Sequence, residues 1–199
     1  SCRECDAEPG RCAGHEHHFP ELSRHSCSPL RGTDASLRAL EKRAGRGGAG
    51  DKLPELAVDV TATTVVLGAL AARDWRPMHH DKDFAQDRNG TQHIFINTPH
   101  NAAYFERYIT DWTGPRGRLG RIQFRMSDSV FPGDTMVFRG EVKAKGVDDA
   151  GCGWVDLSIW LAVGEKVPTR CNARVAVPTG AEDNPWKRKG ENWRPVPAV

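Results

Sequence analysis

No apolar run in this chain approaches the roughly 20 residues that a helix needs to cross a bilayer, so the sequence does not predict a membrane protein. A strong charge of either sign is also lacking, because 28 basic residues face 26 acidic ones and leave a formal net charge of +2. The overall charge therefore gives no warrant for nucleic-acid binding. The first 30 residues contain no apolar signal-peptide core, and on that basis we expect a cytoplasmic protein.

Cysteine is scarce over most of the chain, where Cys152 and Cys171 are the two that follow residue 30. This is not the pattern of a disulfide-stabilised domain, and it fits a reducing compartment. The first 30 residues hold the remaining cysteines and several histidines: Cys2, Cys5, Cys12, Cys27, His15, His17, His18 and His25. Thiolates and imidazoles are zinc ligands, but a zinc domain usually shows two CxxC-type pairs and this segment shows one. We predict no metal site, and keep a zinc-dependent interaction module as an alternative.

The length of 199 residues allows one domain with extensions. Residues 1–53 are rich in Cys, His and Gly and have no sustained apolar period, so we predict a disordered extension that ends in a flexible linker. Residues 179–199 combine prolines, tryptophans and basic residues without a period, and we predict a flexible tail. The single domain is expected to span residues 54–178.

Two helices are predicted within this domain. The first is capped by Thr61 and runs through Ala71, although its β-branched residues weaken the prediction. The second has Thr98 as its N-cap and Pro99 at its first position, and it ends before Gly114. Its apolar residues repeat with helical spacing and define one stripe: Phe105, Tyr108, Ile109 and Trp112.

From residue 121 onward, apolar and polar residues alternate, as in strands with one buried face. The alternation covers about 121–126, 136–142, 155–163 and 171–177, with turns at 131–134 and 164–166. Consecutive antiparallel strands need a cover for their shared apolar face, and the stripe of the second helix can supply it. The fold class predicted is therefore α+β, a curved antiparallel sheet wrapped around a central helix, which is the hot-dog arrangement.

The motif with chemical potential lies between the first helix and the second. Asp74 precedes His79 by five residues, Pro77 lies between them, and a small residue, Ala85, follows six residues after His79. A carboxylate and an imidazole on one turn can hold a water molecule and exchange protons with it, since histidine titrates near neutrality.

This spacing resembles the signature of the MaoC-like (R)-specific enoyl-CoA hydratases, in which Asp, Pro, an aliphatic residue, His and then Ala or Ser occur in this order. The turn at 131–135 is similar too, and the resemblance covers about 125 residues. The chain departs from the family pattern at Arg73, where Gly is usual, at Arg76, where Asn is usual, and at Asn97-Thr98-Pro99, where many relatives have His-Gly. In these departures it resembles the small subunits of actinobacterial heteromeric hydratases that act on steroid-derived enoyl-CoA.

The resemblance implies reversible hydration of a trans-2-enoyl-CoA to a 3-hydroxyacyl-CoA, with Asp74 and His79 as catalytic residues. Substrate contacts are expected from Asn97, Thr98 and His80, because backbone N–H groups at a helix start can meet the thioester oxygen. Asn97 and Thr98 are also plain helix-capping residues, and His80 suits a turn equally well. No cofactor is expected, since CoA enters as part of the substrate.

Partners are expected to be the acyl-CoA and a second hot-dog subunit, either another copy or a homologue, because an open sheet edge invites pairing. Two alternatives to a self-sufficient hydratase remain. One is an acyl-CoA thioesterase, in which the carboxylate would activate water against the thioester carbonyl. The other is a non-catalytic hot-dog subunit that binds acyl-CoA or completes the pocket of a heteromeric hydratase.

Overall fold

The computed structural model describes residues 48–193, and the predicted N-terminal extension lies almost wholly outside this range, as do the last six residues of the tail.

Helix α2 (Ala62–Ala71) has Thr61 as its N-cap, and the side chains of Thr61 and Thr64 each accept a hydrogen bond from the other residue's backbone N–H. The predicted cap and end of this helix are confirmed. The short helix α3 (Lys82–Asp87), capped by Asp81, was not predicted.

Helix α4 (Thr98–Thr113) is the predicted central helix, and its apolar stripe is buried as expected. The N-cap is Asn97 rather than the predicted Thr98, because the Asn97 Oδ1 atom accepts a hydrogen bond from the His100 N–H at 3.1 Å. Thr98 is thereby the first helical residue and Pro99 lies in the first turn. Gly114, with a φ of 75°, ends the helix as predicted.

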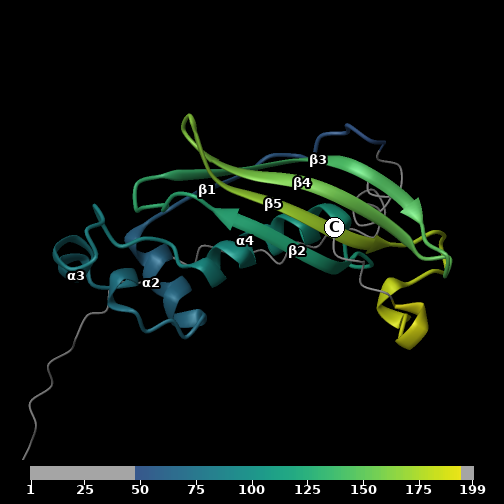
Figure 1. Cartoon of the computed structure of the whole chain (residues 1–199), viewed down its shortest axis with the longest axis horizontal. Helices are drawn as coiled ribbons and strands as arrows, with labels where there is room; N and C mark the ends of the chain where they lie inside the picture. Colours follow the sequence, from purple (N-terminus) through teal and green to yellow (C-terminus); the bar gives the residue numbers. More distant parts are fainter. Residues whose placement is uncertain (1–47, 194–199) are drawn as a thin grey trace, which may run out of the picture. The chain divides into compact units, whose positions relative to one another are not determined.

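Five antiparallel strands form one sheet in the order β1-β3-β4-β5-β2 (Figure 1). Their bounds are β1 Leu56–Asp59, β2 Arg118–Met126, β3 Thr135–Val147, β4 Gly153–Val163 and β5 Lys166–Val177. The four longer strands contain the predicted alternating segments, whereas β1 was not predicted. The edges of the sheet are β1 and β2, and β2 carries the longer unpaired edge.

One face of the sheet is covered by α4, and the core lies between them. Phe138 of β3 is fully buried, with its ring centroid 5.1 Å from that of Phe105 in an edge-on contact. A buried polar link joins the same layers, since the Asn101 amide donates to Thr169 Oγ1 at 3.1 Å. The helix-in-sheet packing confirms the predicted hot-dog fold.

The described part of the predicted tail, residues 179–193, contains two 3-10 turns, η2 (Pro185–Lys187) and η3 (Gly190–Asn192). The Arg118 guanidinium of β2 lies 3.6 Å from the ring centroid of Trp193, and Trp186 Nε1 donates to the Gly117 carbonyl at 3.2 Å. These contacts hold the segment against the start of β2. They depend on pairings over about 70 residues of sequence, which composition does not reveal.

No helix within residues 48–193 has the length and apolarity that crossing a membrane requires.

Candidate active site

The site forms where the chain reverses after α2. Arg73 follows the helix with a φ of 52°, a left-handed conformation that costs a non-glycine residue on the order of 1 kcal/mol. The reversal brings the Asp74 N–H back to the Ala69 carbonyl at 2.9 Å and turns the Asp74 side chain toward the start of α4. The usual glycine of the family pattern at position 73 is explained by this backbone conformation, which Arg73 adopts at some cost.

His79 ends a 3-10 turn, η1 (Pro77–His79), and is 4% exposed. Its Nδ1 atom lies 2.8 Å from the carbonyl oxygen of Phe95. Because a carbonyl can only accept, Nδ1 carries a hydrogen, and in the neutral ring Nε2 is then left with its lone pair. The Nε2 atom faces Asp74 Oδ2 at 3.6 Å.

The Asp74 carboxylate is held by neighbours on both oxygens. Its Oδ2 atom accepts from the Asn97 amide at 3.1 Å, and its Oδ1 atom accepts from the Arg76 backbone N–H at 3.3 Å. Burial raises the pKa of Asp74, but these hydrogen bonds, the positive charge of Arg76 and that of His79 when its ring is protonated outweigh burial and leave the pKa below its usual 3.8. The carboxylate is therefore ionised at neutral pH.

Two acceptors thus face each other across 3.6 Å with no hydrogen between them when the imidazole is neutral. One water molecule can donate a hydrogen to each, which would fix the direction of its oxygen lone pairs. The Asp74 side chain is 17% exposed, so the pair meets solvent on one side. This arrangement suits the positioning and deprotonation of water.

Asn97 serves two elements at once, because its Oδ1 caps α4 while its amide nitrogen donates to Asp74. With Asn97 engaged by the His100 N–H and with Pro99 lacking an N–H, the backbone N–H of Thr98 makes no hydrogen bond among the described residues. It is an available donor at the positive end of the helix dipole. The structure therefore brings Asp74, His79 and Asn97 together, with the N–H of Thr98 beside them.

His80 is placed differently. Its side chain is exposed and forms no hydrogen bond or ion pair among the described residues, and its backbone N–H donates to the Pro77 carbonyl. Substrate contact by His80 stays a prediction. The contact with the Phe95 carbonyl could not be predicted from the sequence, because any residue type can supply a backbone acceptor.

An open apolar cavity of about 550 Å³ lies between α2 and α4. Ala72 lines it two residues before Asp74, and Pro99 lines it two residues after Asn97. The full lining is Thr64, Leu67, Gly68, Ala71, Ala72, Pro99, His100, Ala103 and Tyr104. A Cβ atom on Gly68 would lie 1.8 Å from His100 Nδ1, so the glycine is required for the ring to pack there.

His100 is half-buried, and burial lowers its pKa below the usual 6.5. Its neutral ring stacks on Tyr104 with centroids 4.7 Å apart, which keeps the cavity wall apolar.

The predicted absence of a metal site stays a prediction; within residues 48–193, no group of three or more His, Cys, Asp or Glu side chains is placed to hold an ion.

Replacing Asn97 separates its two roles. Asn97→Asp keeps an oxygen that can cap α4 but puts a second carboxylate beside Asp74, so we expect the pKa of Asp74 to rise above its wild-type value. Asn97→Ala removes the cap as well and should lower the free energy of unfolding by about 1 kcal/mol. Carboxyl chemical shifts followed by NMR against pH, with urea unfolding, measure both effects. An Asp74 pKa unchanged in Asn97→Asp would contradict the assigned contact.

Comparison with known proteins bears on the family and the fold of the chain. A family model described as "MaoC like domain" matches residues 49–156. Over 95 residues, the chain is 39% identical to the 3-oxo-4,17-pregnadiene-20-carboxyl-CoA hydratase beta subunit of Mycobacterium tuberculosis, covering 48% of this chain and 73% of that subunit.

Solved structures give the same fold. A chain from the ChsH1-ChsH2 complex of M. tuberculosis matches with a TM-score of 0.59 and 29% identity, over 65% of this chain and 98% of that chain. The (R)-hydratase from A. caviae involved in PHA biosynthesis matches with a TM-score of 0.59 and 20% identity, over 66% and 97% of the two chains, which shows the fold alone. The family match spans more than half of the sequence, and the chain belongs to the MaoC-like domain family.

Proposed function

We propose that this chain hydrates a trans-2-enoyl-CoA to a 3-hydroxyacyl-CoA, with Asp74 and His79 as its acid–base pair. The observation that supports it most is the 3.6 Å approach of His79 Nε2 to Asp74 Oδ2, two acceptors suited to one water molecule. The Phe95 carbonyl fixes the tautomer of His79, and Asn97 and Arg76 fix the carboxylate. Membership of a family that contains hydratases agrees with this chemistry.

In the proposed reaction, the water oxygen attacks the β-carbon of the enoyl thioester and one water proton passes to the pair. Electron density moves through the α-carbon to the thioester oxygen, where the Thr98 N–H is the donor for the developing negative charge. A proton from the pair then reaches the α-carbon, so one water molecule is added in total and the pair returns to its starting state. The reaction balances in atoms and charge with water as the only added reactant.

The acyl group is proposed to lie in the cavity between α2 and α4. Its lining is mostly apolar and small, with Gly68, Ala71, Ala72 and Ala103 leaving the space open. The pantetheine arm carries amides that would be left without partners on such a wall, so the hydrocarbon part of the substrate fits it better. The relative from M. tuberculosis is named for a pregnadiene-carboxyl-CoA. By analogy, we propose that the substrate of this chain has a bulky polycyclic acyl group.

A homologous hot-dog subunit is the proposed partner. The similar solved structure is a complex of two named components, and strand β2 of this chain has an edge that pairs with no other described strand. Alternatively, this chain completes the pocket of the partner without turnover of its own. The exposed Leu67, Leu70 and Trp75 on the α2 side suit burial in an assembly of either kind.

Product analysis separates hydration from thioester hydrolysis. An enoyl-CoA is incubated with the full chain alone and with the full chain plus a homologous subunit. The mass of the thioester product is measured by mass spectrometry, and released thiol is measured in parallel. A gain of one water with the thioester intact supports the proposal. Free CoA with loss of the acyl group would identify a thioesterase instead.

A further inference from the structure

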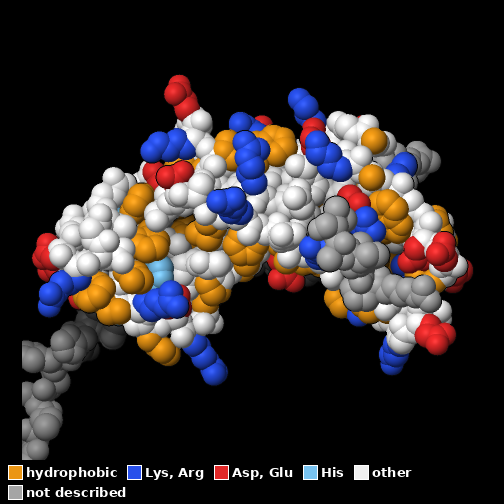
Figure 2. All heavy atoms as spheres, in the orientation of Figure 1, with side chains coloured by type: hydrophobic (Ala, Val, Ile, Leu, Met, Phe, Trp, Pro, Cys, Tyr) orange, Lys and Arg blue, Asp and Glu red, His pale blue; other side chains and the backbone are white. Residues whose placement is uncertain are grey.

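The face of the sheet turned away from α4 is basic along β2 and β5. The side chains that β2 and β5 direct to this face are exposed or half-buried, and they are Arg121, Gln123, Arg125, Arg170, Asn172 and Arg174. Figure 2 shows Lys and Arg side chains gathered over these strands. This face has no part in the proposed hydration, because the Asp74–His79–Asn97 cluster lies at the start of α4.

The register sets arginines directly opposite one another. Arg121 lies across from Arg174, and Arg125 lies across from Arg170. Like charges directly opposite on neighbouring antiparallel strands destabilise the sheet, so the Arg125–Arg170 pair is unfavourable in the absence of an anion.

Carboxylates on this face offset only part of the charge. Asp156 pairs with Arg174 and Glu141 pairs with Lys143. Within residues 48–193, no carboxylate forms an ion pair with Arg125 or Arg170. An excess of positive charge therefore remains on the β2–β5 part of the face.

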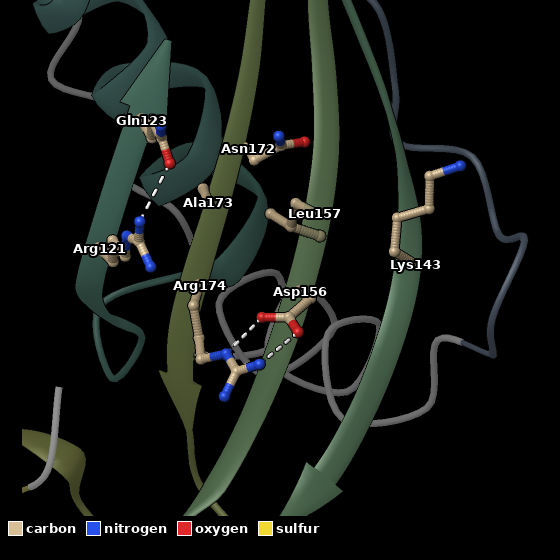
Figure 3. A pocket seen from close by; sticks show the side chains of 8 residues that line it. All are labelled: Arg121, Gln123, Lys143, Asp156, Leu157, Asn172, Ala173 and Arg174. Carbon is tan, nitrogen blue, oxygen red and sulfur yellow. Dashed lines mark hydrogen bonds and ion pairs between the residues drawn. The ribbon is translucent and has the colours of Figure 1, made fainter. Parts of the chain in front are cut away.

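A hollow of about 270 Å³ opens beside these arginines (Figure 3). Three cations and two carboxamides line it together with one carboxylate and two apolar residues: Arg121, Lys143, Arg174, Gln123, Asn172, Asp156, Leu157 and Ala173. The hollow is thus rich in hydrogen-bond donors that carry positive charge.

The arginines of the hollow are oriented before any ligand arrives. Arg174 Nη2 donates to Asp156 Oδ2 at 2.6 Å, and the Arg174 guanidinium lies 4.2 Å from the ring centroid of Trp154. Arg121 Nη2 donates to Gln123 Oε1 at 3.0 Å. These contacts restrict both side chains. The binding of an anion would therefore cost less side-chain conformational entropy than at flexible arginines.

We propose that this hollow binds a phosphate group of a small molecule. Guanidinium groups match the spacing of phosphate oxygens and form charge-assisted hydrogen bonds with them, and the neutral amides of Asn172 and Gln123 add donors. Sites for drug-sized ligands occupy about 300–1,000 Å³, so the hollow suits a charged group rather than a whole large ligand. The phosphate can belong to free pyrophosphate or to CoA.

The test is calorimetric titration of the full chain with inorganic pyrophosphate. Arg121→Gln is expected to weaken binding about tenfold, since it removes charge-assisted hydrogen bonds. Arg139→Gln is the matched control, because Arg139 belongs to the same face and loses the same charge but pairs with Glu55 and does not line the hollow. Its effect should stay within about twofold, the range expected of a screened distant charge.

A second variant protects the test against misfolding. Asn172→Val keeps a residue type suited to a strand and leaves every charge in place, yet removes a donor, so weaker pyrophosphate binding is again expected. CoA and dephospho-CoA are titrated in parallel. Dependence on Arg121 for pyrophosphate supports a general phosphate site, and dependence for CoA alone assigns the phosphate to CoA. No binding of any probe at low-millimolar concentration, or equal losses in Arg121→Gln and Arg139→Gln, would overturn the proposal.

Discussion

Replacing Asp74 with Asn is expected to lower kcat for hydration of an enoyl-CoA by roughly 100-fold or more, as for the loss of a general acid–base group. The amide has nearly the same shape as the carboxylate, so the backbone reversal after α2 should persist. An amide cannot take a proton from water, however, and its NH2 group could point at the Nε2 atom of His79 and occupy the acceptor needed for the water. His79→Ala should cause a loss of similar size, because it removes the other acceptor.

The control for this prediction is Asp111→Asn. Asp111 is an exposed residue of α4 that pairs with Arg107 at 3.5 Å, so the variant loses the same charge away from the cluster. Its kcat should match the wild type. Steady-state rates from enoyl absorbance, with unfolding curves for each variant, provide the measurement. Full activity of Asp74→Asn in a folded protein would refute the assigned pair.

Protonation of Asp74 gives this prediction a pH dependence. The pKa of Asp74 lies below its usual 3.8 in the folded chain. The carboxylate therefore stays ionised at higher pH and becomes protonated as the pH falls through this lowered pKa. Any acid limb that reports Asp74 should therefore lie below pH 3.8. In Asn97→Asp the limb should move upward, since that variant raises the pKa of Asp74.

Filling the cavity between α2 and α4 is expected to change substrate selectivity. Ala103→Leu places three additional carbon atoms in the cavity at an exposed helical position where leucine is well tolerated. For an enoyl-CoA with a polycyclic acyl group, kcat/KM should fall roughly 100-fold, the size expected when a pocket rejects excess hydrocarbon. A four-carbon enoyl-CoA should be hydrated as well as by the wild type, since it does not reach the added side chain.

Ala62→Leu is the matched control for cavity filling. Ala62 is an exposed residue at the start of α2 that does not line the cavity, so the chemical change is the same. Both substrates should be unaffected by it. Equal losses for the short and the bulky substrate in Ala103→Leu would mean that the variant disturbs the catalytic groups, and the acyl assignment would then fail while the hydratase proposal would stand.

Much of the fold could be predicted from the sequence, because its signals are local. Alternation from residue 121 to residue 177 predicted four of the five strands, and the stripe from Phe105 to Trp112 predicted the helix that covers them. Strand β1 escaped prediction because four residues are too few for a period to show. The cap of α4 was misplaced by one residue because Asn97 and Thr98 are both good caps, and the structure shows that the asparagine side chain makes the bond.

The site divides in the same way. The approach of Asp74 to His79 follows from a spacing of five residues with Pro77 between them, which the sequence displays. The amide of Asn97 reaches Asp74 across 23 residues, and the Phe95 carbonyl reaches His79 across 16. Such contacts depend on how α2 and α4 pack together, and no local pattern encodes that packing.

The cavity and the basic hollow also come from packing and register. Gly68 and Ala103 lie on different helices, and each looks like an ordinary helical residue until α2 and α4 meet. Arg121 and Arg174 look like ordinary outward residues of alternating strands until the register sets them opposite each other.

Loss of enoyl absorbance on mixing the full chain with a polycyclic trans-2-enoyl-CoA tests the central claim most directly. It should be measured for the chain alone and after addition of a homologous hot-dog subunit. The account predicts turnover in at least one of the two mixtures, and the same mixture containing Asp74→Asn should lose it. Turnover that persists with Asp74→Asn, or a folded chain inert under both conditions, would contradict the claim that Asp74 and His79 of this chain hydrate an enoyl-CoA.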